Sequence, residues 1–250
     1  MKKIVLRVGD IYKGNLILVN ASHPILSVMV DDLVPADPRY PDVCLKRDAA
    51  NVLQLIEEKI SSGSAIVPVS GYRSNAEQTD IYQNSLKENG AEFTKKYVAL
   101  PKCSEHQTGL AIDLALNKPD IDFICPDFPY DGICQEFRKA AFEYGFIERY
   151  PQDKAHITGI CHEPWHFRYV GYPHSKIMAG YDLTLEEYID FVRQYDISER
   201  LVFSGKCGSA EVFFVPSAGE MTAIEFYESD VFQVSGNNVD GFIVTVWRKE

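Results

Sequence analysis

The chain has 250 residues, of which 36 are acidic and 25 basic, so its formal net charge is −11. Hydrophobic residues make up 46% and charged residues 24%, which is typical of a folded protein and excludes a mostly disordered or collagen-like chain. The negative charge and the lack of a basic block speak against nucleic-acid binding. No apolar run approaches the roughly 18 residues of a membrane span, and Arg7 and Asp10 interrupt the N-terminal run too early for a signal peptide, so we expect a cytoplasmic protein.

The first hundred residues mix helical and strand patterns. Apolar residues at helical spacing from Ala49 to Ile60 predict an amphipathic helix that stops near Gly63. The β-rich run 65–70 contains Pro68, which predicts an edge strand or a bent one. The remaining expectations are a short strand over 16–20, an extended proline-rich loop over 31–42, and a polar helix over 75–88 ended by Gly90.

The mixed pattern continues to about residue 200. The segment from Leu110 to Leu116 is apolar apart from Asp113 and predicts a buried strand, and residues 165–170 alternate as a strand does. The other expected segments are a loop over 117–132, a helix over 135–144 closed by Gly145, and a helix that a capping box opens at Thr184 and that runs to about Tyr195.

After residue 200 short β-rich runs alternate with turns. We therefore divide the chain into a mixed domain over 1–200 and a small β-rich C-terminal extension over 201–250. Because about fifty residues form only a marginal core, we expect the extension to pack on the main domain or on a partner. The expected strands are 212–215, 222–226, 231–234 and 242–247.

The first segment with chemical potential runs from Ser104 to Asp113. A lone carboxylate inside an apolar strand is costly to bury unless it is paired or binds a metal. His106 supplies nitrogen and Asp113 oxygen, both suited to Zn²⁺, and Gly109 allows a tight reversal between them. A His–Asp hydrogen bond that fixes a turn explains the same residues equally well.

The second segment, His162-Glu-Pro-Trp-His166, fits the letters of the helical HExxH zinc motif. Pro164 argues against that interpretation, because a proline inside a helix costs about 3 kcal/mol and disfavours helical angles at the preceding residue. We favour a strand in which His166 is a third zinc ligand and Glu163 a general base beside the metal. No CxxC pair is present that would suggest a cysteine-based site instead.

A third segment, Ser70-Gly-Tyr-Arg-Ser74, joins a strand to a helix. Arg73 at this junction could reach into a cleft and stabilise an oxyanion. A surface arginine that caps a turn is the alternative.

Together these segments resemble the zinc D,D-peptidases of glycopeptide resistance, the VanX, VanY and bifunctional VanXY type. The family carries SxHxxGxAxD, ExxWH and a preceding SGYRS element, and all three occur here in family order, within a resemblance that spans about residues 16–195. The resemblance implies an α+β fold in which a small antiparallel sheet carries the zinc and helices pack on it, as in the related hedgehog domain. The extension 201–250 lies outside the common core.

The same resemblance implies the roles of individual residues. His106, Asp113 and His166 would hold one zinc ion per chain. Glu163 would be the catalytic base, and Arg73 would polarise the scissile carbonyl. The two further residues that would line the substrate pocket are Ser104 and Gln78.

The implied substrates are small peptides that end in D-Ala-D-Ala. A cytoplasmic member would meet both the free dipeptide and UDP-MurNAc-pentapeptide, which favours the bifunctional type and a role in vancomycin resistance. One alternative is an endolysin-like peptidase of wall cross-link peptides, with residues 201–250 as a wall-binding tail. Another is a non-catalytic zinc-containing binding module, against which the presence of both Glu163 and Arg73 argues. A homodimer through the extension is a further option that the sequence leaves open.

Overall fold

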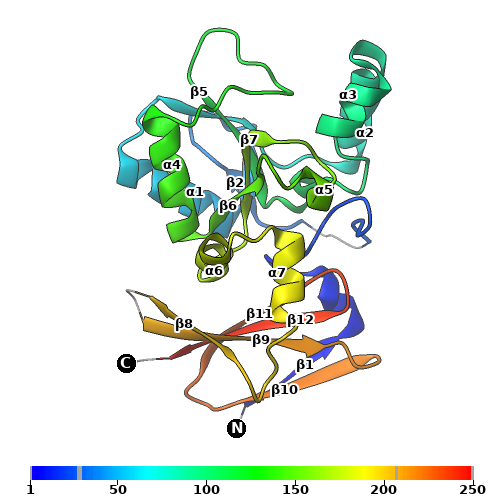
Figure 1. Cartoon of the computed structure of the whole chain (residues 1–250), viewed down its shortest axis with the longest axis vertical. Coiled ribbons are helices and arrows are strands. Elements are labelled where there is room, and N and C mark those ends of the chain that lie inside the picture. The colour runs from blue at the N-terminus through cyan, green and yellow to red at the C-terminus, as the bar shows by residue number, and fades with distance from the viewer. Residues whose placement is uncertain (1, 27–29, 206–207, 249–250) are drawn as a thin grey trace. The chain divides into compact units, whose positions relative to one another are not determined.

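The computed structural model describes residues 2–26, 30–205 and 208–248 (Figure 1). The chain divides into two compact units: residues 19–24 and 28–184 form one, and residues 1–18, 25–27 and 185–250 form the other. The second unit adds residues 1–18, 25–27 and 185–200 to the predicted β-rich extension, which the sequence did not indicate. The division at residue 200 into a catalytic domain and an extension stays a prediction. No helix in the described ranges is long and apolar enough to cross a membrane.

The unit around residues 28–184 has the predicted α+β composition. Its main sheet has four antiparallel strands in the order β4-β5-β7-β6, and a two-stranded sheet joins β2 to β3. The strands are β2 Leu33–Pro35, β3 Cys44–Lys46, β4 Ile66–Ser70, β5 Ala111–Leu116, β6 Phe146–Tyr150 and β7 Glu163–Tyr169. The helices are α1 Arg47–Ile60, α2 Asn75–Glu88, α3 Gly90–Tyr97, α4 Gly132–Tyr144, α5 Ala155–Thr158 and α6 His174–Tyr181, with a 3-10 turn, η2, at Glu105–Thr108.

The main sheet has an apolar face and a polar face, because successive side chains of a strand point to opposite sides. On the apolar face, Ile112 and Leu114 of β5 and Phe167 of β7 pack in one core with α1 and α4. The residues between them, Asp113 and His166, therefore belong to the other face. This alternation is what makes polar side chains available at the centre of a buried sheet.

Helix α1 contributes a buried stripe that includes Leu53 and Ile56, as its apolar spacing predicts. It also carries Glu57, whose Oε1 atom is buried and has no hydrogen-bond partner among the described residues. Burial raises the pKa of Glu57 to about 7, and the negative charge of Asp37 adds to this effect. The neutral form of Glu57 is therefore the one that the fold favours.

We expect Glu57→Gln to remove a pH dependence of stability. A carboxyl whose pKa is higher in the folded state stabilises the fold fully below its unfolded pKa of 4.5, and this contribution is lost as pH rises through about 7. The unfolding free energy of the wild type should fall by about 1–2 kcal/mol relative to the variant between pH 5 and pH 8. Urea unfolding at both pH values measures this difference. Glu58→Gln on the exposed neighbour is the matched control, and equal pH profiles for wild type and Glu57→Gln would contradict the prediction.

The other unit is built mainly of strands. Its larger sheet has the antiparallel order β11-β12-β9-β8, and β1 pairs with β10 in a separate two-stranded ladder. Phe213, Ile224 and Val244 belong to its apolar core. The strands are β1 Lys2–Arg7, β8 Leu201–Gly205, β9 Gly208–Pro216, β10 Met221–Phe226, β11 Val231–Gly236 and β12 Gly241–Arg248, with helix α7 Leu185–Val192 and a 3-10 turn, η1, at Val8–Tyr12.

Most of the expected elements are confirmed, and the differences have local causes. The predicted strand over 16–20 is wrong: the segment is buried, but turns and side chains take its hydrogen bonds, as when Leu16 N donates to Ser235 Oγ at 2.9 Å. Gly90 ends α2 as expected and also begins α3, and the helix expected to reach Tyr195 ends at Val192. The predicted loop 31–42 contains the short strand β2. Strand β4 is an outer strand with an irregular register after Pro68, so both halves of that prediction are confirmed.

Candidate metal centre and active site

Two of the candidate ligands lie directly opposite each other in the main sheet. Asp113 of β5 is the register partner of His166 of β7, and both side chains are buried. Side chains that face each other across an antiparallel pair lie close enough to interact. His166 Nδ1 accordingly lies 2.8 Å from Asp113 Oδ1.

The third candidate comes from the turn just before β5. His106 lies in η2, and Gly109 then adopts a left-handed conformation at φ +70°, which turns the chain back into the strand. His106 Nδ1 donates a hydrogen bond to the carbonyl of Gly71 at 2.7 Å, since that oxygen can only accept. The other ring nitrogen, Nε2, is therefore free of a proton in the neutral ring and lies 3.1 Å from Asp113 Oδ2.

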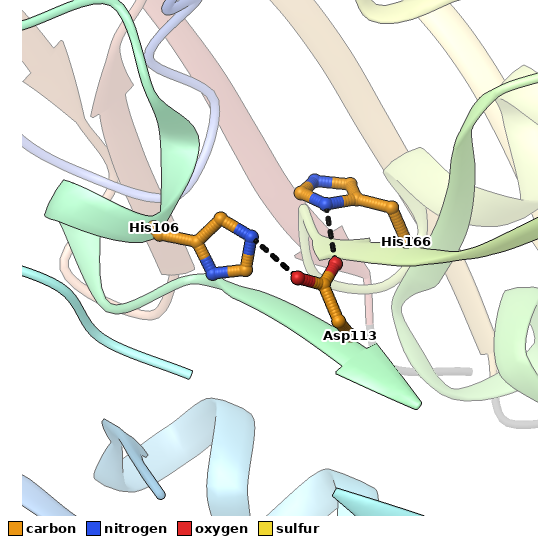
Figure 2. Close-up of side chains that lie close together, drawn as sticks. All are labelled: His106, Asp113 and His166. Carbon is orange, nitrogen blue, oxygen red and sulfur yellow. Dashed lines mark hydrogen bonds and ion pairs between the residues drawn. The ribbon is translucent and has the colours of Figure 1, made fainter. Parts of the chain in front are cut away.

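Figure 2 shows the resulting arrangement: each oxygen of Asp113 faces one imidazole. One possible ligand atom from each of the three residues lies within 4.8 Å of the others. Two imidazole nitrogens and one carboxylate oxygen are the ligand types that zinc prefers, and three protein ligands leave a position for water or substrate. The donor set therefore fits the metal that the sequence suggested.

The electrostatics of this group follow from deep burial and mutual contact. Burial alone would raise the pKa of Asp113, but hydrogen bonds and charge interactions with His106 and His166 hold it well below its usual value. Burial and the neighbouring charge of Arg73 lower the pKa of His106 to about 4. Burial opposes a charge on His166 too, but its contacts with the carboxylates of Asp113 and Glu105 raise its pKa to about 9. Asp113 is thus ionised and His106 neutral at pH 7, as metal ligation requires, whereas His166 would release a proton when a metal binds.

Glu163 stands beside this group at the start of β7. Its Oε2 atom lies 3.8 Å from His166 Nδ1, and its side chain is buried. Burial raises the pKa of Glu163 to about 8, and the negative charge of Asp113 contributes, while the positive charges of His166 and Arg73 oppose the rise. A carboxyl poised near neutral pH can accept and return a proton during a reaction.

Arg73 follows strand β4, and its guanidinium group reaches Asp113. Its Nε donates to Ser70 Oγ at 2.7 Å, and its Nη2 donates to Asp113 Oδ2 at 2.9 Å. Its Nη1 lies 3.4 Å from Gln78 Oε1. The backbone leads into α2 through a capping box formed by Ser74 and Glu77, which fixes the junction. Arg73 therefore points toward Asp113 and is not a surface arginine that caps a turn.

Arg73, Glu163 and the three candidate metal ligands line one pocket. Ser104 and Gln78, the two predicted substrate contacts, are both buried and both line it. Gln78 is held by its amide, which donates to the carbonyl of Ala99 at 2.8 Å. The pocket is also lined by Tyr97, Val98, Phe123, Ile124, Tyr150, Ile160 and Trp165. The structure therefore brings all seven predicted site residues to one pocket.

Sequence reasoning missed Glu105, which also lines the pocket and is only 1% exposed. Its carboxylate forms ion pairs with two fully buried arginines, Arg149 and Arg168, each at 2.8 Å. Burial alone would raise the pKa of Glu105, but the charges of these arginines outweigh it and lower the pKa far below its usual value. The only signal in the sequence was its position next to His106.

The VanY family profile, described as D-alanyl-D-alanine carboxypeptidase, matches residues 43–172. The bifunctional D-Ala-D-Ala dipeptidase and D-Ala-D-Ala carboxypeptidase VanXYC of Enterococcus gallinarum is 45% identical over 179 residues, which cover 71% of this chain and 94% of the relative. A D-alanyl-D-alanine carboxypeptidase of Enterococcus faecium is 32% identical over 252 residues, which cover 95% of this chain and 77% of that protein.

A solved structure is similar over nearly the full length. The vancomycin resistance D,D-dipeptidase VanXYg, crystallised with a D-Ala-D-Ala phosphinate analogue, has a TM-score of 0.98 and 60% sequence identity, and the match covers 99% of both chains. These similarities agree with the motifs around His106 and Glu163 and confirm the predicted family. The chain belongs to the VanY family of D-alanyl-D-alanine carboxypeptidases.

Proposed function

We propose that this protein hydrolyses the D-Ala-D-Ala bond, both in the free dipeptide and at the end of UDP-MurNAc-pentapeptide, and that it contributes in this way to vancomycin resistance. The observation that carries the proposal is that Glu163 and Arg73 flank the His106–Asp113–His166 group inside one pocket. The similarity to bifunctional VanXYC and to VanXYg supports the choice of substrates. All site residues lie between 73 and 166, so the proposal assigns no catalytic role to the extension 201–250.

In this proposal His106, Asp113 and His166 hold one zinc ion. When bound, zinc would polarise a carbonyl as a Lewis acid and would lower the pKa of a bound water molecule to about 7. Cytoplasmic action is part of the same proposal, because both substrates are soluble peptides of the cell interior.

The remaining steps belong to side chains of the chain itself. Glu163 accepts a proton from the attacking water and returns it to the amine of the departing D-alanine, so that one water is consumed and one peptide bond is broken. Arg73 donates hydrogen bonds toward the oxygen that gains negative charge at the scissile carbonyl. Gln78 and Ser104 contact the substrate in the pocket and hold it in register with these groups.

Release of D-alanine tests the proposal directly. We would measure it in parallel on D-Ala-D-Ala and on UDP-MurNAc-pentapeptide, using zinc-loaded protein and Glu163→Ala as the blank. Release from both substrates is the expected result. Release from neither by a zinc-loaded, folded protein would reject the D,D-peptidase function and favour the cross-link peptidase or binding-module alternatives.

Arg73→Lys is expected to lower kcat/KM by about 10²–10³-fold, the loss typical of a missing oxyanion donor. Lysine keeps the positive charge but lacks the planar set of donors with which Arg73 contacts Ser70, Asp113 and Gln78. Steady-state kinetics together with the zinc content of the purified variant check this. An unchanged kcat/KM would remove Arg73 from the proposed mechanism.

A further inference from the structure

We infer that Glu105 is a positioning residue that holds His166 in the ring orientation and tautomer needed to bind the metal. Glu105 Oε2 lies 3.5 Å from His166 Nε2, on the side of the ring away from Asp113. This inference rests on the proposed zinc site and adds to it a group that would not touch the metal.

The two nitrogens of His166 have different surroundings. Nδ1 faces Asp113, the position of a metal ligand, and a nitrogen that binds a metal carries no proton. The single N–H of the neutral ring must then be on Nε2, which is buried and needs an acceptor. Neither Nε2 nor Glu105 Oε2 has a regular hydrogen-bond partner among the described residues, and the two atoms lie 3.5 Å apart. A proton on Nε2 that is donated to Oε2 would satisfy both atoms.

The two oxygens of Glu105 are used differently. Oε1 accepts from Arg149 Nε and from Arg168 Nη1, both at 2.8 Å, and the side chains of all three residues are fully buried. With Oε1 held in this way, Oε2 faces the imidazole of His166. Two buried cations on one carboxylate also keep it ionised, and a charged acceptor forms the stronger hydrogen bond.

The fold places this cluster behind the metal group. Arg168 lies two residues after His166 on β7, so both side chains emerge on the polar face of the sheet, and Arg149 comes from the neighbouring strand β6. Glu105 precedes His106 in the turn η2. One short turn thus supplies a metal ligand and the group that orients a second ligand.

Glu105→Gln is the variant that tests the role. The arginines should keep the amide oxygen, which turns the amide NH₂ toward His166 Nε2, where two donors then oppose each other. The ring is pushed toward the tautomer with its proton on Nδ1, which cannot bind the metal. We expect the zinc dissociation constant to rise by about 10–100-fold, as when outer contacts of a metal ligand are lost. The absorption spectrum of the cobalt-substituted variant should differ from that of the wild type.

Glu211→Gln is the matched control. Glu211 also joins two arginines, Arg200 and Arg248, but lies on β9 in the other unit. It should leave zinc affinity and the cobalt spectrum unchanged. Wild-type affinity and spectrum in Glu105→Gln would overturn the inference while leaving the proposed zinc site intact. Failure of the wild type itself to bind zinc would reject the site and the inference together.

If Glu105→Gln does not fold, a measurement on the wild-type protein can still test the inference. Long-range ¹H–¹⁵N correlation on the zinc-loaded protein identifies the protonated nitrogen of His166. A proton on Nε2 supports the inference, and a proton on Nδ1 contradicts it.

Discussion

Glu163→Ala is expected to lower kcat by about 10²–10⁴-fold on both substrates while zinc stays bound. The carboxylate lies beside the metal group but is not one of the three atoms gathered around the proposed zinc position. Its loss removes the group that moves the proton, not the group that binds the metal. Kinetics at saturating substrate, with zinc content measured on the same sample, test both halves of this result.

Glu163→Gln separates the loss of the base from the loss of side-chain volume. Glutamine keeps the size of the side chain but cannot accept the proton as a base. Equal losses in the alanine and glutamine variants would assign the effect to proton transfer. Since Glu163 is buried, removing its charge also changes the packing of the pocket, so the melting temperature of each variant should be recorded. Turnover close to wild type in both folded variants would exclude Glu163 as the base.

His106→Ala should abolish stoichiometric zinc binding, with a loss of affinity greater than the roughly 100-fold expected for an outer contact. The variant removes a ligand nitrogen and also leaves the carbonyl of Gly71 without its donor, so a loss of stability of about 1–3 kcal/mol should accompany it. Metal analysis after dialysis against zinc-free buffer measures the first effect, and urea unfolding measures the second.

The control for this variant is His156→Ala, which removes an exposed histidine of α5. It should keep one zinc ion per chain. If His106→Ala also kept one tightly bound zinc ion, the proposed ligand set would be wrong, whatever the activity of the variant.

The parts of the fold that were predictable are those with a local cause. The apolar spacing of α1 indicates a helix, and the glycine at residue 145 specifies where α4 ends, each through nearby residues. The strand predicted over 16–20 failed because an apolar run indicates burial but not which groups accept its backbone hydrogen bonds. The pairing of β1 with β10 joins residues more than 200 positions apart, as Lys2 with Phe226, and no local pattern indicates it.

Some residues of the candidate site were likewise predictable from local sequence, and others were not. Asp113 stood out because a carboxylate interrupts an apolar strand, and the family motifs supplied the residues that gather around it. Glu105 did not stand out, because a glutamate in a turn usually faces solvent. Its burial depends on Arg149 and Arg168, which lie 44 and 63 residues further along the chain and meet it only in the folded sheet.

The proline in strand β4 has a consequence for behaviour at high concentration. An outer strand with a full row of free N–H and C=O groups is a template on which a second copy of the protein can add its own strand. Pro68 has no N–H, and a proline is tolerated in a sheet where that group would face away from the neighbouring strand. An incoming strand would therefore lack a donor in the middle of β4, and four of the five residues of β4 are already buried. Both features disfavour edge-to-edge aggregation of the sheet that carries the site.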